Sequence, residues 1–330
     1  MSWALASACI VGGAAAADDL GDGTFVMPQQ IISAATAFAD YVKSASTIDS
    51  GFTSGDEVAH GLKVAASYEP TQIEEGMIAY GAIAALQDDR FVEGVDQAAG
   101  RGQDRDAFAE RLVEDPYAAT RVDGADGAAR RIEVALRAVA QPLISTGAQI
   151  KQAAYSVQHQ AWSKVMVADA QVRLADVKVW SRQAADPGAD DTQAMMEKIG
   201  AEGQRVGDDA SAGYSQIEAR ALALAAEAVL GHAHGADRDR LSPLLTEADS
   251  AECFRMAKLN LYQCMAVAGP QYEDMFCMGQ HAVMDTGSCV DGAARSAART
   301  AVAALSPRPA QAGAAYVQLA SHRTLRADPN

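Results

Sequence analysis

The chain of 330 residues is short of positive charge, aromatic side chains and long apolar runs. It has 27 lysine and arginine residues against 43 aspartate and glutamate residues, for a formal net charge of -16, and only 6% of its residues are aromatic. An acidic surface repels phosphate backbones and anionic lipids. No segment after the N-terminal region offers the ~20 apolar residues that a transmembrane helix needs. We therefore expect no nucleic-acid partner and no transmembrane segment.

Common catalytic signatures are also missing. The sequence has no glycine-rich phosphate loop, no G-x-S-x-G nucleophile motif, no haem-attaching C-x-x-C-H and no zinc-binding H-E-x-x-H. These absences favour a protein that binds a partner and does not turn over a substrate, with no cofactor. An alternative is a hydrolase of cell-wall polymer that uses one carboxylate of the N-terminal helices, either Glu57 or Glu74.

The first residues have the layout of a secretory leader. An apolar run from Trp3 to Val11 is followed by small residues and then by acidic ones, with an A-x-A cleavage site near Ala15 to Ala17. No lysine or arginine precedes the run, so the signal is weak or the natural start lies upstream. Lipidation at Cys9 is a second way of processing this end. Either route removes Cys9 and leaves four cysteines, an even number that suits an oxidising compartment.

Strand-like alternation does not persist anywhere, whereas helical periodicity recurs along most of the chain. Much of the apolar content is alanine, the best helix former. Before residue 125 the pattern predicts short helices that begin at Pro28, at Ser54 with a capping-box-like start, and at Pro70. The sequence therefore predicts an all-α protein that opens with a bundle of short helices.

A longer apolar stripe begins near Ala128, with intervals of three and four residues. Its members are Leu143, Gly147, Ile150, Ala154, Val157, Ala161, Val165, Ala168, Val172, Ala175 and Val179. The spacing predicts one long helix that ends before Asp186-Pro187-Gly188, with Pro142 tolerated as a kink. A second stripe comprises Met195, Ile199, Val206, Ala210, Gly213, Ile217, Ala221, Leu224 and Ala228. We expect the two to form a long antiparallel hairpin, whose seam packs as bundle core or self-associates.

The four remaining cysteines lie between residues 253 and 289. The pattern predicts two helices separated by Gly269-Pro270 and ended by Asp285-Thr-Gly287. Cys253 and Cys264 lie about 16 Å apart along one helix, too far to pair with each other. Counting outward from the Gly-Pro break favours a nested pairing of Cys264 with Cys277 and Cys253 with Cys289. Four cysteines allow three pairings in all, so the sequence leaves the connectivity open.

This block, C-x10-C and C-x11-C, resembles the twin-cysteine helical hairpins of coiled-coil-helix proteins, whose spacing is C-x9-C twice. The likeness is architectural and covers about 40 residues. The block is also similar to that of exported bacterial proteins to which no activity is attached. The resemblance thus implies a disulfide-clamped helical hairpin and no chemistry.

A metal site is the alternative use of the same residues. Cys277, His281 and Met284 share one helical face, and Cys-x3-His-x2-Met is similar to the second half of the dinuclear copper motif of oxidase subunits. Thiolate, imidazole and thioether are soft ligands that suit copper. However, that motif needs another cysteine where this sequence has Glu273, and its host fold is a β-barrel. His232-x-His234 also has ligand-like spacing, but it falls at a predicted helix end.

Together these patterns predict an exported, periplasmic or secreted scaffold that binds an unidentified protein partner. The expected regions are a signal peptide (1–17), a short-helix bundle (18–124), a long helical hairpin (125–236), a four-cysteine helical hairpin (237–305) and a flexible tail (306–330).

Overall fold

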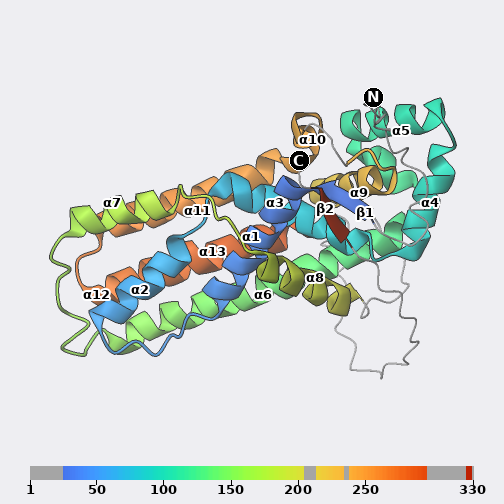
Figure 1. The fold of residues 1–330 in the computed structure, drawn as a ribbon. Helices are drawn as coiled ribbons and strands as arrows, with labels where there is room; N and C mark the ends of the chain where they lie inside the picture. The colour runs from blue at the N-terminus through green and yellow to red at the C-terminus, as the bar shows by residue number, and fades with distance from the viewer. Residues whose placement is uncertain (1–24, 204–212, 234–237, 296–324, 329–330) are drawn as a thin grey trace, which may run out of the picture.

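The structure is a computed structural model that describes residues 25–203, 213–233, 238–295 and 325–328. Helices make up nearly all of its regular secondary structure (Figure 1). These residues form thirteen α-helices, one 3-10 helix, one π-helix and two strands of four residues each. The all-α prediction is confirmed. Among the described helices, none combines the length and the apolar character that crossing a membrane would take.

The N-terminal helices begin where the sequence signals predict. They are α1 (Gln29–Ser46), α2 (Gly55–Ala66) and α3 (Pro70–Ala85), and each starts at or just after a predicted signal. The hydroxyl of Ser54 accepts a hydrogen bond from the backbone of Glu57, as an N-cap does. Helix α3 is buried on nearly all sides, since Met77, Ile78 and Tyr80 are fully covered. It is therefore the centre of this part of the core.

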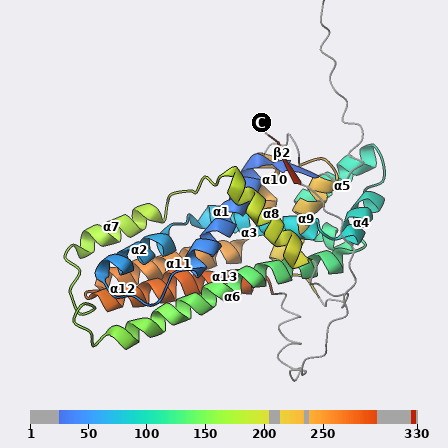
Figure 2. The same cartoon turned by 60° about the horizontal axis from the view of Figure 1, so that its bottom comes forward.

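Helices α4 (Asp89–Ala99), α5 (Gln103–Glu114) and the 3-10 helix η1 (Pro116–Arg121) lead into α6 (Ala125–Val157). Figures 1 and 2 both show α6 running along the length of the molecule, with α4, α5, α9 and α10 near one end and α2, α7 and α12 near the other. Pro142 lies inside α6 on its exposed side, which agrees with its expected tolerance. Helix α6 thus links the two ends.

The predicted long helix stops at Val157, well before Val179. The backbone of residues 163–167 pairs instead with the Gly-Pro break: Val167 donates to the carbonyl of Gly269 at 2.9 Å, and Gln271 donates to that of Val165 at 3.1 Å. The hydroxyl of Ser163 also donates to the carbonyl of Val157. These bonds replace the helical ones, and the chain becomes helical again only at α7 (Ala170–Trp180).

Helix α7 does not form a hairpin with the second stripe. It contacts α11 (Ala248–Val267) and α2, and it runs antiparallel to α11 because Lys178 faces Tyr262 while Arg173 reaches the carbonyl of Ala268. Helix α8 (Ala189–Gly203) contacts α1, α3 and α6. The long antiparallel hairpin is therefore not found among the residues that the structure describes.

The second stripe is divided between α8 and α9 (Gln216–Val229). Its buried members are Met195, Ile199, Ile217, Ala221, Leu224 and Ala228. Val206 and Ala210 lie outside the described residues. Helix α9 begins with the capping box of Ser215 and Glu218, and it packs against α3 and η1. Most of the stripe is thus core, but in two separate helices.

The cysteine region comprises α10 (Arg238–Leu245), α11, α12 (Gln271–Cys277), the π-helix η2 (Met278–Met284) and α13 (Asp285–Ala293). The prediction that Asp285-Thr-Gly287 ends a helix is wrong, since α13 continues through it. A Cβ on Gly287 would lie 2.8 Å from the Cβ of Leu143. This glycine serves close helix packing and not a turn.

Two strands near the ends of the described chain were not expected from the sequence. β1 (Phe25–Pro28) pairs in parallel with β2 (Leu325–Asp328), with Phe25 opposite Leu325. β2 lies within the predicted tail. The rest of residues 306–330, and the whole predicted signal peptide, lie outside the described residues.

Candidate functional site

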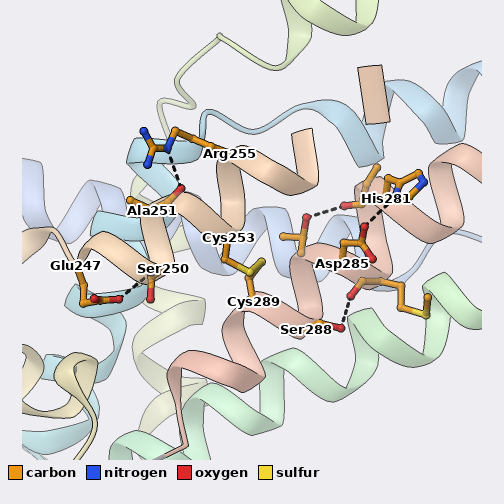
Figure 3. Close-up of a disulfide and its surroundings, with 12 residues drawn as sticks. Glu247, Ser250, Ala251, Cys253, Arg255, His281, Asp285, Ser288 and Cys289 are labelled. Atoms are coloured by element: carbon orange, nitrogen blue, oxygen red, sulfur yellow. Dashed lines mark hydrogen bonds and ion pairs between the residues drawn. A yellow bond between two sulfur atoms is a disulfide. The ribbon is translucent and has the colours of Figure 1, made fainter. Parts of the chain in front are cut away.

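Two disulfides hold the cysteine region together, and they join the same pairs as the nested arrangement favoured from the sequence. Cys253 of α11 pairs with Cys289 of α13, and Cys264 of α11 pairs with Cys277 of α12, with Cα atoms 5.7 and 5.6 Å apart. Figure 3 shows the first bridge between the two helices. Because Cys289 lies in α13, this bridge joins two helices.

Two of the three side chains of the soft-metal alternative, those of Cys277 and His281, are used in other contacts. Cys277 is buried and its sulfur is bonded to that of Cys264. His281 Nδ1 lies 2.8 Å from Asp285 Oδ2, a pair that Figure 3 draws. Although burial raises the pKa of Asp285, the contact with His281 and that with Gln280 bring it below its ordinary value. With this disulfide formed, Cys277 has no thiolate to offer a copper ion.

No other metal centre is formed by the part of the chain that the structure describes. Nowhere among those residues do three or more His, Cys, Asp or Glu side chains gather in a way that could hold an ion. His232 Nε2 lies 3.1 Å from Asp106 Oδ1, while His234 falls outside the described ranges. His232, the described histidine of this motif, therefore has a carboxylate partner.

Glu57, one carboxylate of the hydrolase alternative, helps to cap α2. It lies on the edge of a cleft of about 730 Å³ beside the end of α1. The backbone N–H of Thr53 donates to its Oε2 at 2.7 Å, and the Thr53 hydroxyl also donates to the carboxylate. These bonds hold the pKa of Glu57 below its ordinary value. Glu57 is thus an ionised, exposed carboxylate, whereas a general acid must carry a proton.

Glu74, the other such carboxylate, is enclosed by protein. Its side chain on α3 is only 2% exposed, and its Oε1 accepts a hydrogen bond from the backbone of Glu247 at 2.5 Å. Burial raises the pKa of Glu74. Glu247 in turn caps α11 by accepting from Asp249 and Ser250, as part of Figure 3 shows. Glu74 therefore joins α3 to the start of α11 and does not face a substrate.

A buried lysine, which sequence reasoning missed, lies beside the end of α7. Lys258 Nζ donates to the carbonyl of Ala66 at 2.7 Å and to the hydroxyl of Ser181 at 3.1 Å, and it lies 3.3 Å from the ring centroid of Tyr68. Burial lowers the pKa of Lys258 well below its ordinary value. Serine and lysine at this distance could form a nucleophile and its base. Both are almost completely covered, however, so here they fasten α7 to α11.

The apolar stripe divides into a buried part and an exposed part at the end of α6. Leu143, Ile150 and Val157 are at most 8% exposed, whereas Val165, Val172 and Val179, which resume the seven-residue interval after one step of eight, are 56%, 57% and 54% exposed. The intervening alanines, Ala161, Ala168 and Ala175, are exposed as well. We call Val165, Ala168, Val172, Ala175 and Val179 the exposed stripe. Its sequence pattern is that of a helix-packing seam, but no helix of the described chain covers it.

More apolar surface lies at the same end of the molecule. Met166 is 64% exposed and Val267, beside the Gly-Pro break, is 84% exposed. The backbone contact between Met166 and Pro270 brings these two segments together. Exposed apolar side chains that gather in one region mark interaction surfaces more often than singly scattered ones do. The exposed stripe and its surroundings are therefore the candidate functional site.

Comparisons with known proteins add no family to this description: no protein-family model matches the sequence, no curated protein matches it, and no solved structure matches it.

Proposed function

We propose that the protein is a non-enzymatic, exported scaffold that binds another protein in the bacterial envelope through the exposed stripe. The single observation that carries this proposal is the contrast within one sequence pattern. Where the pattern is buried, it packs α6 against neighbouring helices; where it continues, its valines are more than half exposed. A face with valine and alanine at heptad spacing suits a partner helix or extended segment.

The exposed stripe covers only part of what a stable protein interface needs, so a partner must also contact the surface around it. Of the exposed stripe, only Val172, Ala175 and Val179 lie in α7, which has 11 residues. Stable dimers bury about 800 Å² on each partner, and a helix of this length covers much less. Self-association through the stripe stays a secondary prediction, which the experiment below separates from partner binding.

Export is supported by the disulfides and by the leader-like residues 1–17. Two bridges within one small helical region are typical of proteins of the periplasm or the cell exterior. Intact mass of the protein from its native compartment tests this part. We expect a chain without the leader whose thiols react with iodoacetamide only after reduction. A full-length chain with freely reactive thiols would overturn it.

Site-specific photo-crosslinking in the native host tests partner binding. We expect p-benzoylphenylalanine at Val179 to capture one or a few envelope proteins. The matched control carries the same residue at Glu110, an exposed position of α5 near the other end of the molecule (Figure 1). Equal yields at both positions, or no product at Val179, would overturn the proposal. A product with twice the mass of the chain would favour self-association.

A further inference from the structure

A groove of about 580 Å³ lies between α2 and α7. Its walls are the first turns of α2, the segment that joins α6 to α7, one face of α7, and the start of α12. Part of the exposed stripe, namely Val165, Ala168 and Val172, lines it. The groove is therefore continuous with the surface assigned to partner binding.

The groove is largely apolar and carries two aromatic side chains. Trp162 and Trp180 line it and are both half-buried, with part of each ring system packed against the core. Tryptophan faces accept the flat guanidinium of arginine and the methylene groups of lysine. Two such rings, with Val165 and Val172 between them in sequence, offer contacts to a side chain that is both long and charged.

The charged residues of the groove are unbalanced. Arg173 is the cation that lines it, and its charge is already matched by the buried Asp274. Asp56, Asp169 and Asp176 line the groove as well, and all three are exposed. None of the ion pairs found among the described residues includes any of these three. The groove therefore presents negative charge to solvent.

Helix ends account for only part of this charge. Asp56 lies in the first turn of α2, where its carboxylate interacts favourably with the helix dipole. Asp169 precedes α7 as its N-cap residue but makes no side-chain capping bond. Asp176 lies in the middle of α7, away from either end. Helix ends thus explain the position of Asp56 and in part that of Asp169, but they give Asp176 no structural role.

We infer that this groove binds a basic segment of the partner protein. This inference rests on the proposed function and names the chemistry that the site recognises. Arginine or lysine side chains of the partner meet Asp169 and Asp176, their stems lie against Trp162 and Trp180, and an apolar neighbour covers Val172. Neutral glycans also stack on tryptophan, but they do not compensate three exposed carboxylates. The charge therefore favours a basic peptide over a glycan strand.

Selection from a random peptide library displayed on phage tests this inference, with the full chain in its disulfide-bonded form as bait. We expect the selected peptides to be enriched in arginine or lysine next to leucine or an aromatic residue. Binding of the synthetic peptides is followed through the fluorescence of Trp162 and Trp180. It should weaken as salt is raised from about 50 to about 300 mM, because charge pairs at exposed sites are screened.

Matched variants locate the site. Asp169→Asn with Asp176→Asn should weaken peptide binding at least tenfold. Glu93→Gln with Glu110→Gln removes the same charge from exposed positions on α4 and α5 and should leave binding unchanged. Selected peptides without basic residues, or peptides that bind the Asp169/Asp176 variant as tightly as the original chain, would overturn the inference.

Two further outcomes count against the groove. One is a library that yields no specific peptide, and the other is binding of chitohexaose at the groove where peptides fail. If either occurs while photo-crosslinking at Val179 still captures an envelope protein, the basic-segment inference fails and the proposed function stands. If crosslinking fails too, both are overturned.

Discussion

Arg173 of α7 forms a buried ion pair with Asp274 of α12. Its Nη1 lies 2.7 Å from one carboxylate oxygen and 2.8 Å from the other, and the two side chains are only 10% and 4% exposed. Its Nη2 donates to the carbonyls of Met265 and Ala268 at the end of α11. Val177 is the buried residue of α7, so this helix has little apolar contact with the core. The polar contacts of Arg173 therefore contribute much of the free energy that holds α7 in place.

Replacing Arg173 should therefore loosen α7 and destabilise the protein. Arg173→Met leaves the charge of Asp274 buried and unpaired, a change that typically costs about 3–5 kcal/mol. We expect lower urea resistance and faster amide hydrogen exchange throughout α7. Arg182→Met, at an exposed position just after the helix, is the control and should change neither quantity. Unchanged exchange in α7 would show that Arg173 does not hold it.

The same pair predicts a pH dependence of stability. Burial raises the pKa of Asp274 from 3.8 to about 6, even though Arg173 opposes the shift. Between these two values the folded chain retains a proton that the unfolded chain has lost, so the contribution of this group to the free energy of unfolding falls as pH rises from 3.8 to about 6.

Urea unfolding between pH 4 and pH 8 measures this contribution. Glu74 and Glu227, whose pKa values are also raised by burial, contribute in the same direction. The difference in the free energy of unfolding between the original chain and Asp274→Asn isolates the contribution of Asp274. We expect that difference to change mainly below pH 6. A difference that stays constant from pH 4 to pH 8 would contradict the assignment.

A third prediction concerns the contact between α6 and the π-helix η2. A Cβ on Gly147 would lie 2.6 Å from the carbonyl oxygen of Gly279 and 2.6 Å from the backbone nitrogen of Met284. Neither backbone atom can move away easily, so we expect Gly147→Ala to destabilise the protein by about 1–3 kcal/mol. Thermal unfolding measures the change.

Gly200 provides the control for that substitution. It lies in α8, and a Cβ there would meet nothing within 4 Å. Alanine is favoured over glycine inside a helix by about 1 kcal/mol, so Gly200→Ala should stabilise the protein. The same change thus has opposite signs at the two positions. A neutral Gly147→Ala would show that α6 and η2 can separate at little cost.

The sequence predicted local features well, because they depend on nearby residues. The cap at Ser54, the starts of the first three helices and the break at Gly269-Pro270 between α11 and α12 all follow from local signals. The all-α class follows from the same periodicity. Gly287 differs, because its local sequence predicts the end of a helix, whereas the residue packs closely against Leu143 of a helix distant in the sequence.

The candidate site could not be predicted, because exposure depends on contacts between distant segments. The stripe from Leu143 to Val179 keeps intervals of three and four residues, with one interruption between Val157 and Val165, and nothing in that spacing tells which half is covered. The division arises because residues 163–167 pair with the Gly-Pro break, about a hundred residues later in the chain. Arg173 and Lys258 have no motif at all, since their partners come together only in the folded chain.

The last prediction concerns the disulfides. The bridge between Cys253 and Cys289 closes 36 residues, and that between Cys264 and Cys277 closes 13. Restricting the unfolded chain by loops of these lengths contributes about 4 and about 3 kcal/mol respectively. Alanine pairs at each bridge should therefore both lower the urea midpoint, with the outer pair having the larger effect.

Replacing both bridges together also tests how the helices depend on each of them. Because the two loops are nested, each bridge shortens the free loop that the other one closes, so replacing all four cysteines should cost somewhat more than the sum of the two pair losses. Circular dichroism should still report an all-α protein for each double variant, since α3 packs mainly against α1, α6 and α9, none of which carries a bridged cysteine. Loss of all helical signal with the inner pair alone would show instead that this bridge is needed for the chain to fold.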